Sequence, residues 1–210
     1  MPNNEQKITL GVLNAIHDNS RITQRSMAGE LGIALGLTNS YLKRCVKKGL
    51  IKVKQAPANR YAYYLTPQGF SEKSRLAREY LTQGFQFFRI AREQCSEIFR
   101  ICSDQGQKKI ALHGLTDLTE IAVLCASEHD VELVSIIDPS SKLDKYNDIP
   151  IHSGFSSLDD FDALIITDLG SSQQEFDLLV KHYGTDCVFA PAILKLSSKS
   201  KLKRMVGYHG

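Results

Sequence analysis

The first third of the chain shows two stretches of helical periodicity followed by two of strand periodicity. Apolar residues recur every three to four positions over 23–32, which opens on a threonine suited to an N-cap, and again over 35–49. The second stretch places an expected buried face on Leu35, Thr38, Leu42, Cys45 and Val46. Apolar residues then alternate with other residues over 51–54 and 61–65, as in the two strands of a hairpin. This order predicts a winged helix-turn-helix over residues 1–67.

The expected outer face of the second helix is polar and basic, and the hairpin adds further cations. Long cations and small polar groups suit contacts with phosphates and base edges. The candidate DNA-binding residues are Asn39, Ser40, Tyr41, Lys43, Arg44, Lys47, Lys52, Lys54 and Arg60. Residues 55–60 contain Pro and Asn, which predict the tip of the wing. The alternative is a helical hairpin and a β-hairpin whose charged face is only solvated.

Charge is divided unevenly along the chain. Residues 1–67 hold ten Lys or Arg and three Asp or Glu, a net charge of +7. Residues 105–194 hold five Lys or Arg and fifteen Asp or Glu, a net charge of −10. The net charge of +3 for the whole chain therefore averages two regions of opposite sign. A basic domain joined to an acidic one favours a nucleic-acid-binding domain, with double-stranded DNA as its partner, fused to a second domain of another function.

One run of sequence carries a family resemblance. GELGIALGLTNSYLKRCVKKGLIKVK, followed by YAYYLTPQGFSEKSRLAREYL, resembles the MarR-type regulators associated with bacterial exopolysaccharide gene clusters, over about residues 5–100. The most specific part is the return strand that continues into 65–69, LTPQG, and then a helix. The resemblance implies transcriptional control of surface-polysaccharide genes. Leu37 departs from it, because a polar or basic residue is expected there.

Residues 68–106 predict a long connecting helix, which could extend ~50 Å if it is unbroken. Its apolar residues share one face: Ala77, Leu81, Phe85, Phe88, Cys95, Ile98, Phe99 and Cys102. A winged domain of this size cannot cover such a helix, so we expect a homodimer formed through residues 70–104, as is common for helix-turn-helix proteins. The alternative is a rigid connector that packs on the C-terminal domain of its own chain.

Residues 107–194 alternate apolar strands with amphipathic helices. Strands are expected at 109–113, 131–137, 149–151, 163–167 and 188–190, and helices at 117–128, 157–160 and 173–182. This alternation predicts a parallel sheet covered on both sides, a Rossmann-like α/β domain. The fold class is therefore α/β plus α+β, with a winged helix-turn-helix, a connecting helix and a Rossmann-like domain.

Ligands in such sheets bind beyond the carboxyl ends of the strands, where the first strand leads into a helix. The turn at 113–119 keeps one glycine of the dinucleotide fingerprint, and an aspartate ends the second strand where a ribose-binding carboxylate would lie. The candidate ligand-binding residues are His113, Gly114, Thr116, Thr119 and Asp138. Two alternatives stay open: a sensor for a nucleotide or nucleotide sugar, and a domain that binds nothing and serves as a dimerisation or partner platform.

A second resemblance concerns this domain. ALHGLTDLTEIAVLCA, VELVSIIDPS and IPIH resemble the N-terminal domain of PglD-type sugar acyltransferases, which bind nucleotide sugars, and the corresponding region of sugar-nucleotide epimerases. The redox repressor Rex also joins a winged helix to a Rossmann domain. Rex keeps the full glycine fingerprint for NADH, and this chain does not.

The sequence argues against catalysis. None of the eight tyrosines has a lysine four residues later, and neither GxSxG nor zinc-ligand spacing is present. His113 and His152 are isolated candidates, and we expect hydrogen-bonded structural roles for them.

Composition indicates a cytoplasmic protein. The N-terminus lacks signal-peptide features, and no run of 18 apolar residues could span a membrane. The five scattered cysteines are expected to be reduced, with a thiol redox sensor as the alternative. The basic tail 195–210 is expected to be a disordered extension or an accessory phosphate contact.

Overall fold

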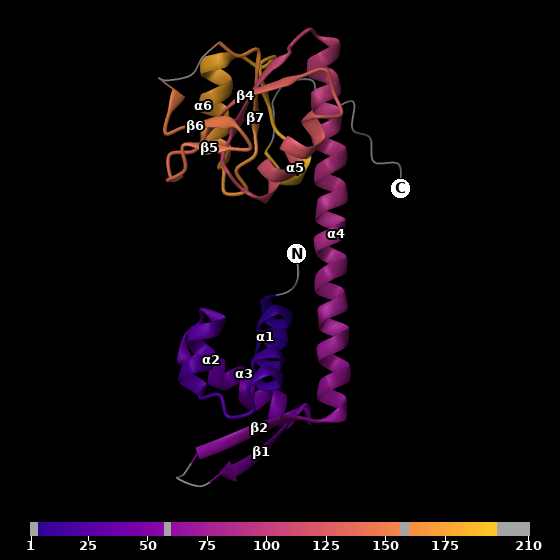
Figure 1. Ribbon diagram of the computed structural model, residues 1–210, viewed down its shortest axis with the longest axis vertical. Coiled ribbons are helices and arrows are strands. Elements are labelled where there is room, and N and C mark those ends of the chain that lie inside the picture. The colour runs from indigo at the N-terminus through magenta and orange to yellow at the C-terminus, as the bar shows by residue number, and fades with distance from the viewer. Residues whose placement is uncertain (1–3, 57–59, 156–159, 197–210) are drawn as a thin grey trace. The chain divides into compact units, whose positions relative to one another are not determined.

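A computed structural model describes residues 4–56, 60–155 and 160–196. The chain divides into two compact units, Met1–Gln86 and Phe87–Gly210. The first holds the helices and hairpin of the N-terminal region, and the second holds an α/β fold (Figure 1). Within the described ranges, no helix combines the length and the apolar character needed to cross a lipid bilayer.

The N-terminal unit begins with a helix that the sequence analysis missed. Its elements are α1 (Asn4–Asp18), α2 (Gln24–Leu31), α3 (Leu35–Lys47), β1 (Ile51–Ala56) and β2 (Arg60–Leu65). The Thr23 side chain caps α2 by accepting a hydrogen bond of 3.1 Å from the Ser26 amide, as predicted. Gly32 ends α2 in the left-handed conformation at φ 62°. The five elements build the core of this unit with the first turns of α4 (Pro67–Asp104).

The buried face of α3 is narrower than predicted. Thr38, Leu42 and Cys45 are buried, but Leu35 and Val46 are 40% and 37% exposed because both lie on one edge of this strip. The hairpin differs from its prediction in the same way. Val53 and Tyr61 are 40% and 57% exposed, whereas Ile51 and Tyr63 are buried in the core of the unit.

The hairpin and α4 meet at a tight joint. The Thr66 hydroxyl donates to the carbonyl of Gly49 at 2.7 Å and accepts from the amide of Gly69 at 3.0 Å. The Thr66 amide donates to the carbonyl of Leu50 at 3.0 Å. A Cβ on Gly69 would lie 3.0 Å from the carbonyl carbon of Leu50 and closer still to its oxygen. The LTPQG sequence therefore fixes the start of α4 against the turn that follows α3.

Helix α4 has 38 residues, which corresponds to about 57 Å at 1.5 Å per residue. Leu76 joins the core of the N-terminal unit, and a later group of α4 residues is buried in the core of the α/β unit: Ala91, Cys95, Ile98, Phe99 and Cys102. The predicted apolar face is thus divided. Leu81, Phe85 and Phe88 lie between the two buried parts and are 58%, 65% and 39% exposed.

The C-terminal unit contains a six-stranded sheet in the order β5-β6-β4-β3-β7-β8. Its strands are β3 (Lys109–His113), β4 (Glu132–Ile137), β5 (Lys145–Tyr146), β6 (Ile149–His152), β7 (Ala163–Ile166) and β8 (Val188–Phe189). Neighbouring strands are parallel except β5, which pairs antiparallel with β6 and was not predicted. The fold class is confirmed, with the correction that the sheet is mixed.

Helices cover both faces of this sheet. The end of α4 and α5 (Asp117–Ala126) pack with Ile110 and Leu112, whereas α6 (Gln173–Tyr183) packs with Ala111 on the opposite face. A 3₁₀ turn, η2 (Ala192–Leu194), follows β8. The helix predicted at 157–160 falls mostly on residues 156–159, outside the described residues, as do residues 197–210 of the basic tail.

Candidate nucleic-acid interface and strand-edge cluster

The outer face of α3 carries exposed cations and no acid. Lys43 and Lys47 are exposed, and the segment LGLTNSYLKRCVK contains neither Asp nor Glu. Ser40 is also exposed, but its hydroxyl donates to the carbonyl of Gly36 at 3.0 Å, so only its lone pairs face outward. Asn39 is half-buried, and its Oδ1 has no hydrogen-bond partner among the described residues. The face therefore attracts anions through its lysines.

Arg44 and Tyr41 are engaged within the domain. The Arg44 guanidinium lies 4.9 Å from the centroid of the Tyr41 ring and forms an ion pair with Glu5 of α1. Both partners of this ion pair are almost half exposed, so the pair contributes little stability and DNA phosphate can compete for the guanidinium. The contact between α1 and α3 was not foreseen from the sequence.

The wing adds cations and aromatic rings. Lys52 and Lys54 are exposed on β1, and the Lys54 ammonium lies 5.7 Å from the centroid of the Tyr64 ring. Tyr61 and Tyr64 are 57% and 44% exposed. Residues 57–59 of the predicted wing tip are outside the described residues. Arg60 pairs with Ala56 through its backbone, and its side chain is not among those described.

One cation of this surface was missed from the sequence. Arg25 is exposed in the first turn of α2. In a helix-turn-helix the first helix of the motif crosses the DNA backbone, so a cation at its start can contact phosphate. Because Thr23 was predicted to cap α2, the sequence already placed Arg25 in the first turn of that helix and could have identified it as a candidate.

A comparison with protein families decides the nature of this unit. Residues 5–52, from α1 to the start of β1, match the model described as winged helix-turn-helix DNA-binding. The N-terminal unit is a winged helix-turn-helix DNA-binding domain. The basic α3 is the helix that this motif places against DNA.

Solved structures give weaker likenesses. MepR of Staphylococcus aureus, a transcription regulator of the multidrug efflux pump MepA, matches with a TM-score of 0.35 and 24% identity, over 40% of this chain and 62% of MepR. The MepR–DNA complex matches with a TM-score of 0.35 and 23% identity, over 40% of this chain and 61% of that one. Human N-acetylserotonin methyltransferase in complex with SAM matches with a TM-score of 0.37 and 13% identity, over 88% of this chain and 73% of the methyltransferase.

These TM-scores are too low to support a functional conclusion, and the chain spans only about 62% of the length of the MepR structure. No curated protein matches the chain.

In the α/β unit, the five predicted ligand residues lie together at the carboxyl edge of the sheet. His113, at the end of β3, is 95% buried and stacks on Phe155 at a centroid distance of 5.6 Å. Its Nε2 lies 3.4 Å from a carboxylate oxygen of Glu175 on α6. Its Nδ1 is buried and has no partner within the described part of the chain.

The two threonines of the predicted phosphate-binding turn form a capping box on α5. The Thr116 hydroxyl accepts from the amide of Leu118 at 3.2 Å and donates to the carbonyl of Thr167 at 2.6 Å. The Thr119 hydroxyl accepts from the amide of Thr116 at 2.9 Å and donates to the carbonyl of Gly114. The donors that a phosphate needs at a helix N-terminus are thus largely used by the protein itself.

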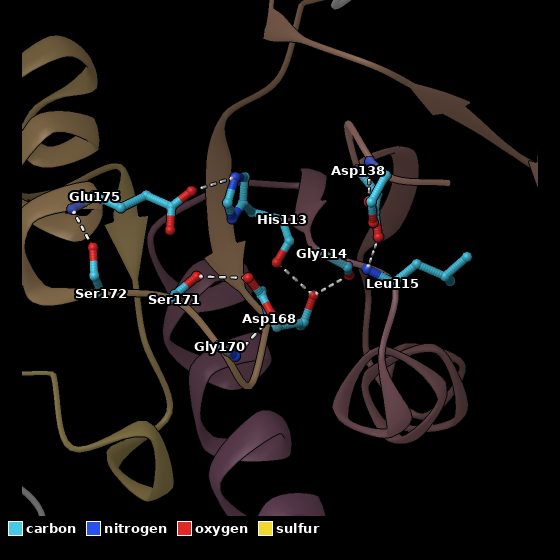
Figure 2. Close-up of polar contacts among 11 residues, drawn as sticks. His113, Gly114, Leu115, Asp138, Asp168, Gly170, Ser171, Ser172 and Glu175 are labelled. Atoms are coloured by element: carbon cyan, nitrogen blue, oxygen red, sulfur yellow. Dashed lines mark hydrogen bonds and ion pairs between the residues drawn. The ribbon is translucent and has the colours of Figure 1, made fainter. Parts of the chain in front are cut away.

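Asp138, at the end of β4, is also engaged by backbone. One carboxylate oxygen accepts from the amide of Leu115 at 2.9 Å (Figure 2). The other accepts from Ser140 and from the amide of Ser141. Burial raises the pKa of this carboxyl, but the hydrogen bonds from Ser140, Leu115 and Ser141 outweigh burial and leave the pKa below its usual value. In this geometry Asp138 holds the turn after β3.

Gly114 lies where the strand order reverses, between β3 and β7. It has φ 95°, and a Cβ added to it would lie 2.6 Å from the Cα of Asp168 and 2.8 Å from its nitrogen. The Thr167 hydroxyl donates to the carbonyls of His113 and Gly114 at 3.0 and 2.8 Å. The chain after β7 therefore occupies the space next to Gly114 that a fingerprint glycine leaves for a pyrophosphate.

The remaining chemistry of the chain is limited. No cluster of three or more His, Cys, Asp or Glu side chains suited to a metal ion occurs among the residues that the structure describes. Burial raises the pKa of the Cys45 thiol to about 11 and those of Cys95 and Cys102 to about 12. Since the thiolate is the reactive form, these three cysteines are poor candidates for redox sensing.

Proposed function

We propose that the protein is a MarR-type transcription regulator that places α3 and the β1–β2 hairpin on duplex DNA, acts in the cytoplasm and controls surface-polysaccharide genes. The observation that carries the proposal is the acid-free outer face of α3, with Lys43 and Lys47 exposed, in a unit that matches a DNA-binding family. The MarR type and the gene class rest on the sequence resemblance over residues 5–100.

Replacing Lys43 or Lys47 with alanine should weaken DNA binding. We expect a roughly fivefold to tenfold loss for each variant at low salt, because each lysine neutralises one phosphate. The slope of log K against log salt concentration should flatten by about 0.9 per variant. Fluorescence anisotropy with a labelled duplex at several salt concentrations measures both quantities.

Lys181→Ala is the matched control, because Lys181 is an exposed lysine on α6 of the acidic unit. It should leave affinity and slope unchanged. If Lys43→Ala and Lys47→Ala behave as this control does, α3 is not the surface that contacts DNA.

The proposal includes a homodimer formed through α4. Leu81, Phe85 and Phe88 follow the i, i+4, i+7 spacing of a coiled-coil seam and are more than a third exposed. Elsewhere on the helix, ion pairs of Arg75 with Glu72 and of Arg100 with Glu97 form a charged surface. A second copy of α4 would cover the apolar seam by two-fold symmetry, and two DNA-binding units would then match a palindromic site.

Replacing Phe85 with glutamate should convert the dimer to a monomer, because each copy would place a carboxylate in an apolar seam. Light scattering at micromolar concentration should give twice the chain mass of 23.5 kDa for the natural sequence and once that mass for the variant. Leu178→Glu on α6, which changes a side chain that is 66% exposed, should remain dimeric. A natural protein that is monomeric under these conditions contradicts the homodimer.

For the α/β unit, the geometry favours the partner or dimerisation platform over the nucleotide sensor. The support is the engagement of Thr116, Thr119 and Asp138 in internal hydrogen bonds. The unpartnered, buried Nδ1 of His113 is the observation that favours the sensor. A sensor should show a higher melting temperature when UDP-sugars are added, whereas a platform should show no change. We assign no catalysis to the chain, since His113 faces a phenyl ring and one carboxylate among the residues that the structure describes at the strand edge.

A further inference from the structure

Leu37 lies in the first turn of α3 and is 42% exposed. It shares one side of the helix with Tyr41 and Arg44, four and seven residues later, next to the outward-facing Gly36 and Ser40. A single exposed leucine is common on protein surfaces and needs no explanation by itself. Its meaning here depends on which other groups that part of α3 offers to DNA.

The first turn of α3 carries few hydrogen-bonding side chains. Gly36 has no side chain, and the Ser40 hydroxyl proton is used by the carbonyl of Gly36. Arg44 is paired with Glu5 and stacked on Tyr41. The first residues of a recognition helix are those that contact base edges in the major groove. Thr38 is buried and Gly36 has no side chain, so the exposed side chains of the first turn of α3, Leu35 and Leu37, are apolar.

We propose that Leu37 is a specificity-determining residue that packs against the 5-methyl group of thymine in the major groove. This inference rests on the proposed function, since it concerns the same DNA-binding surface. Thymine is the one base that presents an apolar group there, and apolar side chains recognise it by contact. Lys43 and Lys47, further along α3, hold the helix in the groove through phosphates and leave the base choice to Leu37.

The same contact disfavours the other bases. Cytosine presents an amino donor in the major groove, and guanine presents two acceptors. A leucine removes water from these groups and returns no hydrogen bond, so their desolvation is not compensated. Leu37 thus selects for thymine both by the methyl contact and by the cost that other bases incur.

Leu35 provides a matched control on the same turn. It is 40% exposed, nearly the same as Leu37, but it lies on the other edge of the buried strip, with Asn39 and Val46. Leu35→Ala therefore also truncates an exposed leucine of α3, but on the opposite side of the helix from Tyr41 and Arg44.

The test begins with duplexes that the natural full-length protein selects from a random library at low salt. Each thymine of the selected site is then replaced by uracil, which lacks only the 5-methyl group. The natural protein should lose about fourfold in affinity at one thymine per half-site, equivalent to about 0.8 kcal/mol for one buried methyl-sized group. Leu37→Ala should bind the thymine and uracil duplexes equally, whereas Leu35→Ala should keep the fourfold preference.

The outcomes separate this inference from the proposed function. If the natural protein binds duplex DNA but shows no thymine preference at any position, Leu37 does not read thymine and the DNA-binding function stands. A preference that persists in Leu37→Ala also overturns the inference, because another residue then makes the contact. Failure to bind any duplex overturns the proposed function together with this inference.

Discussion

Replacing Gly69 with alanine should lower the free energy of unfolding of the winged helix-turn-helix unit by about 3 kcal/mol. The added Cβ would lie 3.0 Å from the carbonyl carbon of Leu50 and closer to its oxygen, so backbone rather than a flexible side chain has to move. That carbonyl also accepts the amide of Thr66 at 3.0 Å and its hydroxyl at 3.3 Å. The clash therefore disrupts the joint between the turn after α3 and the start of α4.

Urea unfolding followed by hydrogen exchange measures this loss in the N-terminal unit, and DNA affinity should fall with it. Gly29→Ala is the control, because a Cβ on Gly29 of α2 would meet nothing within 4 Å. That variant should be neutral or more stable by about 0.5–1 kcal/mol, since alanine loses less backbone entropy than glycine in a helix. A Gly69→Ala protein as stable as the natural one would show that the joint is not tight.

Replacing Gly114 with alanine should destabilise the α/β unit by about 3 kcal/mol or more. Two costs add: a residue with a Cβ is strained at φ 95°, and that Cβ would approach the backbone of Asp168 to 2.6–2.8 Å. The ends of β3 and β7 would have to separate. DNA binding by the N-terminal unit should be affected much less than the unfolding of the α/β unit.

Hydrogen exchange at the amides of β3 and β7 reports on this change directly. Gly154→Ala offers the comparison, because a Cβ on Gly154 would meet nothing within 4 Å and its backbone is not left-handed. That variant should leave exchange at both strands unaltered. Unaltered exchange in Gly114→Ala as well would mean that Asp168 can move away from the turn without loss.

Features that depend on neighbouring residues were predicted well from the sequence. The Thr23 cap, the end of α2 at Gly32 and the β-α-β alternation follow from periods and caps, which are local properties. The two-residue strand β5 was missed because so short a strand has no period of its own. Helix α1 was also not predicted, although Ile8, Val12 and Ile16 recur at helical spacing and are buried.

Contacts between distant residues could not be predicted. The sequence indicates that Lys43, Arg44 and Lys47 share the outer side of a helix, but the pairing of Arg44 with Glu5 spans 39 positions. Similarly, Asp138 was expected to bind a ribose, whereas the structure places its carboxylate on the amide of Leu115, 23 positions earlier. Such pairings depend on tertiary packing, which a single sequence does not reveal.

The joint at Thr66 and Gly69 has a mechanical consequence. Because Thr66 and Gly69 are hydrogen-bonded to the turn after α3, the start of α4 is held directly against the end of α3. A rotation of the first turns of α4 should therefore rotate α3 with it, because these hydrogen bonds link the two helices. Any event that rotates this part of α4 changes the angle at which α3 approaches the double helix.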